Sequence, residues 1–198
     1  MKKLLITLAV SLCFMGAGFA QETSASEMAV RGGANINIQP VMGDFADYVS
    51  LNIGGGASAE IDLPISLPDW IKIGVPVNLG ANVSIPKTDM IQSMWNLQLS
   101  SGIYARFLMM DGSLIIQPEL DYGMAGYFIT PTDYYSDTIN SFYLDQMFQF
   151  SLNVRYAPKN ILDGKMEFSI APVYALSPEM DEMAHYFGVR LGVFYKLM

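Results

Sequence analysis

The stretch LNIGGGASAEIDL, residues 51–63, alternates between two kinds of residue along its whole length. Its odd-numbered positions hold apolar residues or glycine, and its even-numbered positions hold polar residues or glycine. A period of two residues is that of a β-strand, whose successive side chains point to opposite faces. The stretch therefore predicts a strand with one apolar and one polar face.

The same alternation recurs in seven further segments of the chain. They are residues 30–41, 71–85, 95–107, 114–124, 148–156, 166–174 and 187–197. Each segment is close to the roughly 9–11 residues of a tilted membrane strand, and bacterial membrane barrels have an even number of strands. No run after the N-terminal segment is apolar for the ~18 residues of a membrane-spanning helix. We therefore predict an all-β fold: a closed, antiparallel, eight-stranded transmembrane up-and-down β-barrel.

The composition indicates which face of these strands points outward. The chain is 52% hydrophobic and only 15% charged, whereas about 25% of the residues in soluble domains are charged. The polar face holds mainly Gly, Asn, Ser and Gln, rather than the Lys and Glu of a water-facing surface. Small residues suit the narrow interior of an eight-stranded barrel. The apolar face is therefore expected to meet lipid, and a soluble lipocalin-like barrel with reversed faces is the alternative.

Residues 1–20 have the pattern of a secretory signal peptide. Lys2 and Lys3 precede an apolar run that is too short to span a bilayer, and small residues precede Gln21. We expect cleavage before Gln21, which leaves a short segment, 21–28, and a barrel domain, 29–198. An exported barrel of this kind is expected in a bacterial outer membrane, with outer-membrane lipid as its surroundings.

Removal of the signal peptide also changes the chemistry of the chain. It takes away the only cysteine, Cys13, and two of the 11 basic residues, so that nine basic residues remain against 19 acidic ones. So acidic a chain lacks the basic footprint of a nucleic-acid-binding protein. With one histidine and no remaining cysteine, the sequence predicts no metal site and no cofactor.

The polar faces of the predicted strands carry charges of both signs. The residues concerned are Glu60, Asp62, Lys72, Arg106, Glu119, Asp121, Arg155, Glu167 and Arg190. Unpaired buried charge is costly, so these side chains are expected to form ion pairs inside the barrel. A selectivity lining for passing solutes is the functional alternative.

The connections between strands predict two different ends of the barrel. With both termini taken as periplasmic, the periplasmic turns fall near 64–69, 109–113 and 157–165, and the outer loops near 43–48, 86–93, 129–141 and 177–185. Aromatic residues near the strand ends indicate two interfacial girdles. The outer girdle would hold Tyr48, Trp95, Tyr127, Phe128, Phe142 and Phe187, and the inner one Trp70, Phe107, Tyr156 and Tyr195. The prolines at 40, 76, 118 and 172 interrupt predicted strands and are expected at bulges or near the rims.

The third outer loop, TPTDYYSDTIN, is the longest connection. Asp133, Tyr134, Tyr135 and Asp137 are the candidates for contact with an extracellular ligand or host factor, because aromatic side chains concentrate binding energy at interfaces. The alternative is that both tyrosines extend the outer girdle and only anchor the rim.

The stretch SLIIQPELDYGMAG, residues 113–126, resembles a strand of the small outer-membrane barrels of the OmpA, OmpX and OmpW families. The closing GVRLGVFYKL, residues 188–197, resembles their C-terminal strand, which the barrel-assembly machinery reads. That resemblance implies an assembly signal on the alternating face of Val189, Leu191, Val193, Tyr195 and Leu197. Those families usually end on an aromatic residue, whereas this chain ends on Leu197-Met198, so the signal is displaced by one residue.

Four functions are compatible with the sequence. We rank a structural or surface-interaction role through the extracellular loops first, because no catalytic pattern stands out. The resemblance to OmpW implies the second, a channel for small, hydrophobic solutes. The third is an enzyme that modifies lipid A with His185, for which Ser177 and Glu182 are the nearest partners in sequence. A soluble periplasmic binding barrel comes last, and we expect that the protein is not an enzyme.

Overall fold

The computed structural model describes residues 28–137, 139–179 and 182–197. The predicted signal peptide and residues 21–27 lie outside these described residues. Eight strands make up the fold: β1 (Val30–Met42), β2 (Val49–Asp62), β3 (Ile71–Pro86), β4 (Ile91–Met109), β5 (Leu114–Pro131), β6 (Phe142–Tyr156), β7 (Met166–Glu179) and β8 (Glu182–Lys196). Short 3-10 turns connect some of them: η1 (Asp44–Asp47), η2 (Met110–Gly112), η3 (Asp133–Tyr135) and η4 (Leu162–Gly164).

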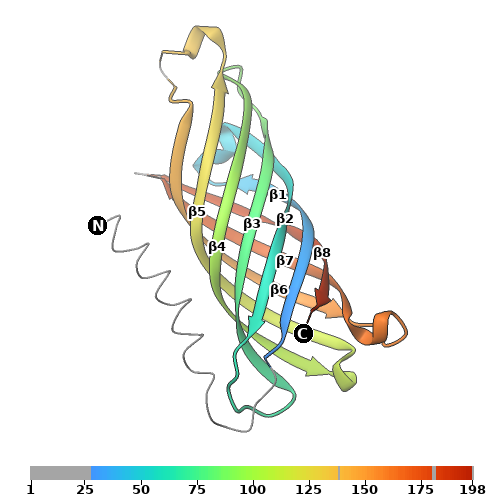
Figure 1. Ribbon diagram of the computed structural model, residues 1–198. Helices are drawn as coiled ribbons and strands as arrows, with labels where there is room; N and C mark the ends of the chain where they lie inside the picture. Colours follow the sequence, from blue (N-terminus) through green and yellow to red (C-terminus); the bar gives the residue numbers. More distant parts are fainter. Residues whose placement is uncertain (1–27, 138, 180–181, 198) are drawn as a thin grey trace.

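Each strand pairs antiparallel with its neighbour in sequence, and β8 pairs with β1 to close the barrel. This result confirms the predicted fold class. Figure 1 shows η1 and η3 at one end of the barrel, which we call the loop end. The turns η2 and η4 lie at the opposite end, where β1 begins and β8 ends, and we call it the terminal end.

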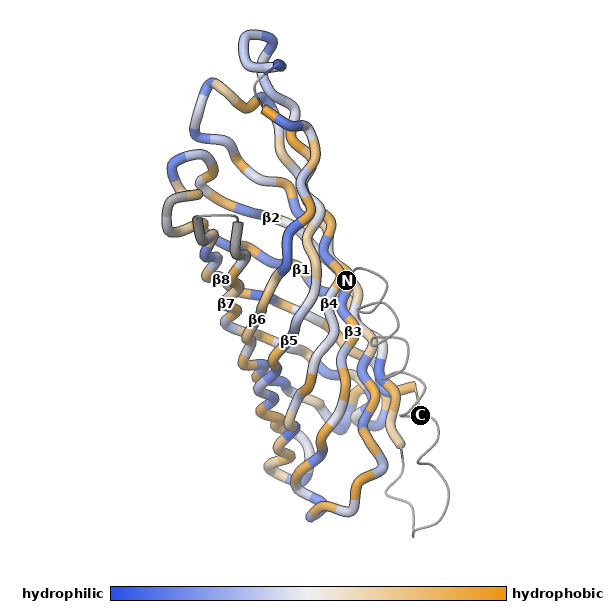
Figure 2. The backbone as a smooth tube through the Cα atoms, turned by 90° about the vertical axis from the view of Figure 1, so that its left-hand side faces the viewer, coloured by the Kyte–Doolittle hydropathy of each residue, from blue (hydrophilic) through white to orange (hydrophobic). Residues whose placement is uncertain are grey.

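The two faces of the strands have opposite chemistry. Large outward side chains are apolar, as at Ile36 in β1, which is 60% exposed, and most of the buried inward ones are polar, as at Gln117 in β5, which is fully buried. Figure 2 shows the resulting alternation of hydrophilic and hydrophobic residues along the strands. The alternative of a soluble barrel with reversed faces is therefore wrong. Among the described residues, no helix is both long and apolar enough to cross a membrane.

The strands extend further at the loop end than the sequence pattern indicated. β4 begins at Ile91 and β8 at Glu182, so half of the loop expected at 86–93 is strand, as is every described residue of the loop expected at 177–185. The backbone ladder continues there, with Pro178 opposite Met183 and Glu179 opposite Glu182. Alternation weakens above the apolar band, but pairing between backbone groups does not require it.

None of the prolines at 40, 76, 118 and 172, which were expected at bulges or near the rims, lies at a register shift, but Pro40 is near the loop-end rim, two residues before the end of β1. The register shifts fall at Val49/Leu51 and Ile91/Ser93. Pro86 and Pro131, the last residues of β3 and β5, are the strand prolines that lie at the two register shifts. Pro118 pairs with Leu152 of β6, while the ladder on its other side, to β4, skips two residues and resumes in the same register. A proline lacks only the N–H that one neighbouring strand would accept, so the cost is confined to one side of the strand.

Two aromatic pairs mark the ends of the apolar band. Trp95 stacks on Phe128 toward the loop end, with ring centroids 4.0 Å apart, and Trp70 stacks on Phe107 at the terminal end, at 6.2 Å. The placement of Tyr127 in the outer girdle is wrong, because this side chain points into the barrel and is 2% exposed. Its odd-numbered position puts it on the same face as Glu119 and Asp121.

Candidate functional site: a closed lumen and an exposed loop end

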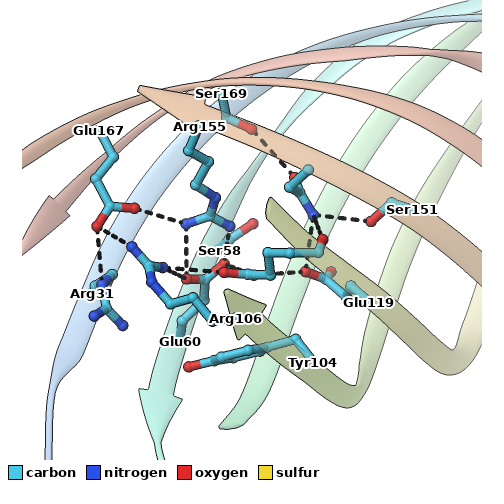
Figure 3. A network of polar contacts seen from close by, with 12 residues as sticks. Arg31, Ser58, Glu60, Tyr104, Arg106, Glu119, Ser151, Arg155, Glu167 and Ser169 are labelled. Carbon is cyan, nitrogen blue, oxygen red and sulfur yellow. Dashed lines mark hydrogen bonds and ion pairs between the residues drawn. The ribbon is translucent and has the colours of Figure 1, made fainter. Parts of the chain in front are cut away.

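A buried network of charged side chains crosses the lumen near the terminal end (Figure 3). Glu167 of β7 lies at its centre and accepts hydrogen bonds from three arginines on other strands. Arg31 of β1 donates at 3.1 Å and Arg155 of β6 at 3.2 Å, and Arg106 of β4 is also bonded to it. One carboxylate therefore joins four strands.

Glu60 of β2 is the second carboxylate of this network. Both terminal nitrogens of Arg155 donate to it, one of them at 2.9 Å. A terminal nitrogen of Arg106 lies 3.7 Å from Oε2 of Glu60, the oxygen that accepts the 2.9 Å bond. Arg155 is thus held between Glu60 and Glu167, with no contact to solvent.

Asp62 completes the network at its terminal side. Arg31 donates to both of its oxygens at 2.9 Å, in the bidentate geometry that suits a guanidinium and a carboxylate. The hydroxyl of Tyr104 donates to the same carboxylate at 2.6 Å. Three arginines thus face three carboxylates, and this balance of charge is what a buried ion network requires.

A second polar layer lies above the ion network. Gln117 connects the two, since it accepts a hydrogen bond from Arg106 at 3.1 Å and donates both to Glu60 at 3.0 Å and to Glu119 of the second layer at 3.4 Å. The amide of Asn78 donates to both Glu119, at 3.1 Å, and Asp121, at 3.0 Å.

The other two predicted lumen cations, Arg190 and Lys72, also point inward. Arg190 lies 3.9 Å from Glu119. Lys72 is half-buried at the terminal end, opposite Arg106 in the ladder between β3 and β4. The nine residues predicted to line the lumen therefore all lie on its inner face.

A cluster of buried apolar side chains occupies the loop end of the lumen, with the half-buried Asp145 on the same inward face, opposite Ala125. The buried members are Val41, Val49, Ile91, Met94, Ala125, Tyr127, Met147, Ala175, Ala184 and Tyr186. Phe45 of η1 packs edge-on against Tyr127, with ring centroids 6.5 Å apart. The ammonium of Lys87 donates to the carbonyl of Ala46 at 2.7 Å and so ties η1 down at this end. We call this group, with Phe45, the apolar seal.

The connection between β5 and β6 stands beyond this seal (Figure 1). Tyr134 at its tip is 86% exposed and meets Tyr135 edge-on at 4.9 Å. Asp133 and Asp137 are exposed on either side. Tyr134 therefore lies free of the girdle pair of Trp95 and Phe128.

The predicted assembly residues of β8 all point outward. Val189, Leu191, Val193, Tyr195 and Leu197 are each exposed on the apolar surface. This is the face on which an assembly factor or lipid could read them. Their role as an assembly signal remains a proposal.

The serine proposed as a catalytic partner does not lie beside the histidine. Ser177 points inward, is fully buried and donates to the carbonyl of Gln146 at 2.9 Å. His185 points outward, next to Tyr174. The alternation along β7 and β8 puts these two side chains on opposite faces of the barrel wall. Among the described residues, no three His, Cys, Asp or Glu side chains are grouped to hold a metal ion.

Sequence reasoning left four residues out of the network: Arg31, Tyr104, Gln117 and Phe194. Tyr104 and Gln117 fall on the polar face of their predicted strands but were given no partner, whereas Arg31 and Phe194 were not placed on the inward face. Ile36 and Ile38 point outward, for example, and so position 31 must point inward. Counting parity from the clearest apolar residue of each strand would have found all four.

Solved structures of known proteins share this architecture. Neisserial surface protein A, NspA, superposes with a TM-score of 0.53 at 9% sequence identity, over 88% of this chain and 100% of that one. The outer membrane enzyme PagL also gives a TM-score of 0.53 at 9% identity, over 81% of this chain and 97% of that one. No protein-family model matches the sequence, and no curated protein matches it.

At this level of identity the likeness shows the fold alone. It agrees with the resemblance to small outer-membrane barrels that the sequence indicated. Together with the apolar outward face, this is the fold of a protein embedded in a bacterial outer membrane. One of the two structures is called an enzyme and the other a surface protein, so the fold does not decide the function.

Proposed function

We propose that this barrel is a surface-interaction protein that does not conduct solutes and that contacts a partner through the connection between β5 and β6. The observation that carries the proposal is the occupied lumen. Side chains from five strands fill it near the terminal end, and the apolar seal fills it at the loop end. The loop end is then the part of the molecule that faces outside the cell.

The occupied lumen argues against the channel alternative. An eight-stranded barrel encloses a space that side chains can fill completely. The ion network is balanced in charge and buried, so solutes would have to break several charge-assisted hydrogen bonds to pass. The apolar seal would in addition exclude water from the mouth.

The partner proposed for the loop carries cationic groups. Tyr134 presents an aromatic face that is nearly free of contacts to the barrel, and Asp133 and Asp137 lie close to it in the chain. Cations bind both to carboxylates and to aromatic faces. Lys87, the basic side chain of the connection between β3 and β4, donates to the carbonyl of Ala46 and not to Asp133 or Asp137.

Two measurements test the proposal on refolded protein in lipid nanodiscs and planar bilayers. The first is binding of a lysine-rich peptide, which we expect to weaken when Tyr134 and Tyr135 are replaced by serine. Met110→Ser is the matched control, since Met110 is as exposed but lies at the terminal end. The second is conductance, which we expect to be absent. Steady current steps would favour the channel alternative. Equal binding of the peptide by all variants would show that the connection between β5 and β6 does not contact it.

A further inference from the structure

One hydrogen-bonded polar pair interrupts the outward face of the barrel. The hydroxyl of Tyr174 on β7 lies 2.6 Å from Nδ1 of His185 on β8. Among the strand residues whose side chains the structure describes, no Asp, Glu, Lys or Arg occupies an outward position. His185 is therefore the basic side chain that the described strands present to lipid.

The hydrogen bond to Tyr174 determines what His185 can offer to its surroundings. A phenol has a proton to donate, and a neutral imidazole accepts at one ring nitrogen and donates at the other. When Nδ1 accepts from Tyr174, the ring proton of the neutral imidazole is on Nε2; in the other tautomer Nδ1 donates to Tyr174, and the phenol keeps its own proton for another acceptor. In either tautomer the pair has two protons and uses one between its members, so it presents one donor on the outer surface, and that donor needs an acceptor oxygen.

The position of His185 along β8 gives its depth in the membrane. Tyr195, at the other end of the same outward row, belongs to the inner girdle. Ten residues of a strand tilted by about 40° rise by roughly 26 Å, and the apolar band of such barrels is about 25 Å tall. His185 therefore lies at the outer boundary of the band, where lipid phosphates and acyl carbonyls are found.

A second polar side chain lies near this boundary. His185 pairs in register with Leu176 of β7, and Leu176 pairs with Phe148 of β6. Gln146 is the next outward position of β6 toward the loop end, and its side chain is exposed. Gln146 and His185 thus flank β7 at a similar depth, with the apolar Leu176 between them.

We propose that Tyr174, His185 and Gln146 form a binding site for a lipid of the outer leaflet. The Nε2–H of His185 donates to a phosphate or acyl-carbonyl oxygen of that lipid, Tyr174 positions the ring, and Gln146 adds a second hydrogen bond. Leu176 supports the first carbons of an acyl chain. This site is separate from the loop that contacts the partner, and neither proposal depends on the other.

The single histidine allows a direct test by solid-state NMR. Protein labelled with ¹⁵N-histidine is reconstituted into bilayers of diacyl phosphatidylcholine, and the contact of Nε2 with lipid ³¹P and with ¹³C-labelled acyl carbonyls is measured. Bilayers of diether phosphatidylcholine retain the phosphate and lack the carbonyls, so they distinguish the two acceptors. Contact with either nucleus supports the site, and contact with neither overturns it.

Tyr174→Phe is the matched variant, because it removes one hydroxyl and keeps the ring. We expect the lipid contact of Nε2 to be lost in Tyr174→Phe and retained in Tyr122→Phe, a change on β5 that is outward as well. Heat-modifiable migration on gels verifies that both variants fold. Equal lipid contact in wild type and Tyr174→Phe would show that Tyr174 does not position the ring, and that result would overturn the proposed pair.

Discussion

The guanidinium carbon of Arg155, on β6, lies 3.8 Å from the centre of the Phe194 ring, on β8. The two side chains meet inside the lumen, with β7 between their strands. An aromatic face attracts a cation by about 2 kcal/mol when both are shielded from water. Phe194 thus packs on a cation that already pairs with Glu60 and Glu167. It borders the ion network beside the pairing of β1 with β8.

Gly33 leaves the space that the Phe194 ring fills. A Cβ atom at position 33 would lie 2.4 Å from the ring, whereas one at Gly32 would have its nearest neighbour 3.9 Å away. Because Arg155 also packs on this ring, we expect Gly33→Ala to destabilise the barrel by about 1–3 kcal/mol through overpacking. Urea unfolding in detergent or lipid measures this loss. Gly32→Ala is the control and should unfold like the wild type.

The network should be sensitive to the loss of a single carboxylate. Glu167→Gln leaves Arg31, Arg106 and Arg155 facing fewer negative charges in a buried space. We expect a loss of about 3–5 kcal/mol in the free energy of unfolding, the usual cost of breaking a buried pair from one side. Lys159→Ala, which removes an exposed ion pair with Asp111, should cost about 0–1 kcal/mol. Similar midpoints for the two variants would contradict the paired network.

The effect of an arginine on the outward face of β8 should depend on its depth in the membrane. Leu191 lies near the middle of the apolar band and Leu197 at its terminal edge. Arginine at a midplane position costs about 2–4 kcal/mol and at the interface about 0–1 kcal/mol. Leu191→Arg should therefore reduce the fraction of folded, heat-modifiable protein on gels far more than Leu197→Arg. Equal effects would mean that the register of β8 is not the one described.

Cysteine labelling tests the two faces of β6 without disturbing the charges. Ser151 is inward and buried, and Leu152 is its outward neighbour. Once the predicted signal peptide is removed, the chain has no cysteine of its own, so each introduced thiol is unique. We expect a maleimide dissolved in the lipid phase to label Leu152→Cys quickly and Ser151→Cys slowly. The opposite order would indicate that the faces are reversed.

The fold could be predicted from the sequence because each strand carries its own signal. Alternation along Leu51 to Leu63 shows both the strand and its inward face, and the same holds for the other strands. Pro118 does not disturb this prediction. It interrupts the backbone ladder on one side of its strand and leaves the register intact. Tyr127 was assigned to the outer girdle because it is aromatic, whereas its odd-numbered position in β5 places it on the inward face.

The pairing of the lumen charges was not predictable in the same way. Arg155 and Glu60 are 95 residues apart in sequence, and they meet only because the tilt of the strands brings those two positions to one height. Arg31 lies at the start of a strand whose alternation is weak, so it was overlooked. The hydrogen bond between Tyr174 and His185 depends on the register between β7 and β8, which no local pattern encodes.

The last prediction concerns the two closures of the lumen, which we expect to act independently. Phe45→Ala combined with Tyr127→Ser removes the edge-on ring contact and opens the loop end. Glu60→Ala combined with Arg155→Ala removes one negative and one positive charge together, so the network keeps its balance of charge while two of its side chains are cut back. Because solutes must pass both layers, neither double variant alone should conduct in planar bilayers. The quadruple variant should show steady current steps, provided that it still migrates as a folded, heat-modifiable barrel.

Phe148→Ala, an outward change on β6, is the control for a general loss of packing and should leave the barrel closed in every background. If the loop-end variant alone conducts, the ion network is not a barrier, and the terminal half of the lumen must already pass ions. If the quadruple variant folds and stays silent, the second polar layer, where Asn78 bridges Glu119 and Asp121, is itself sufficient to close the lumen. Conductance of the four combinations thus assigns the barrier to a particular layer of side chains.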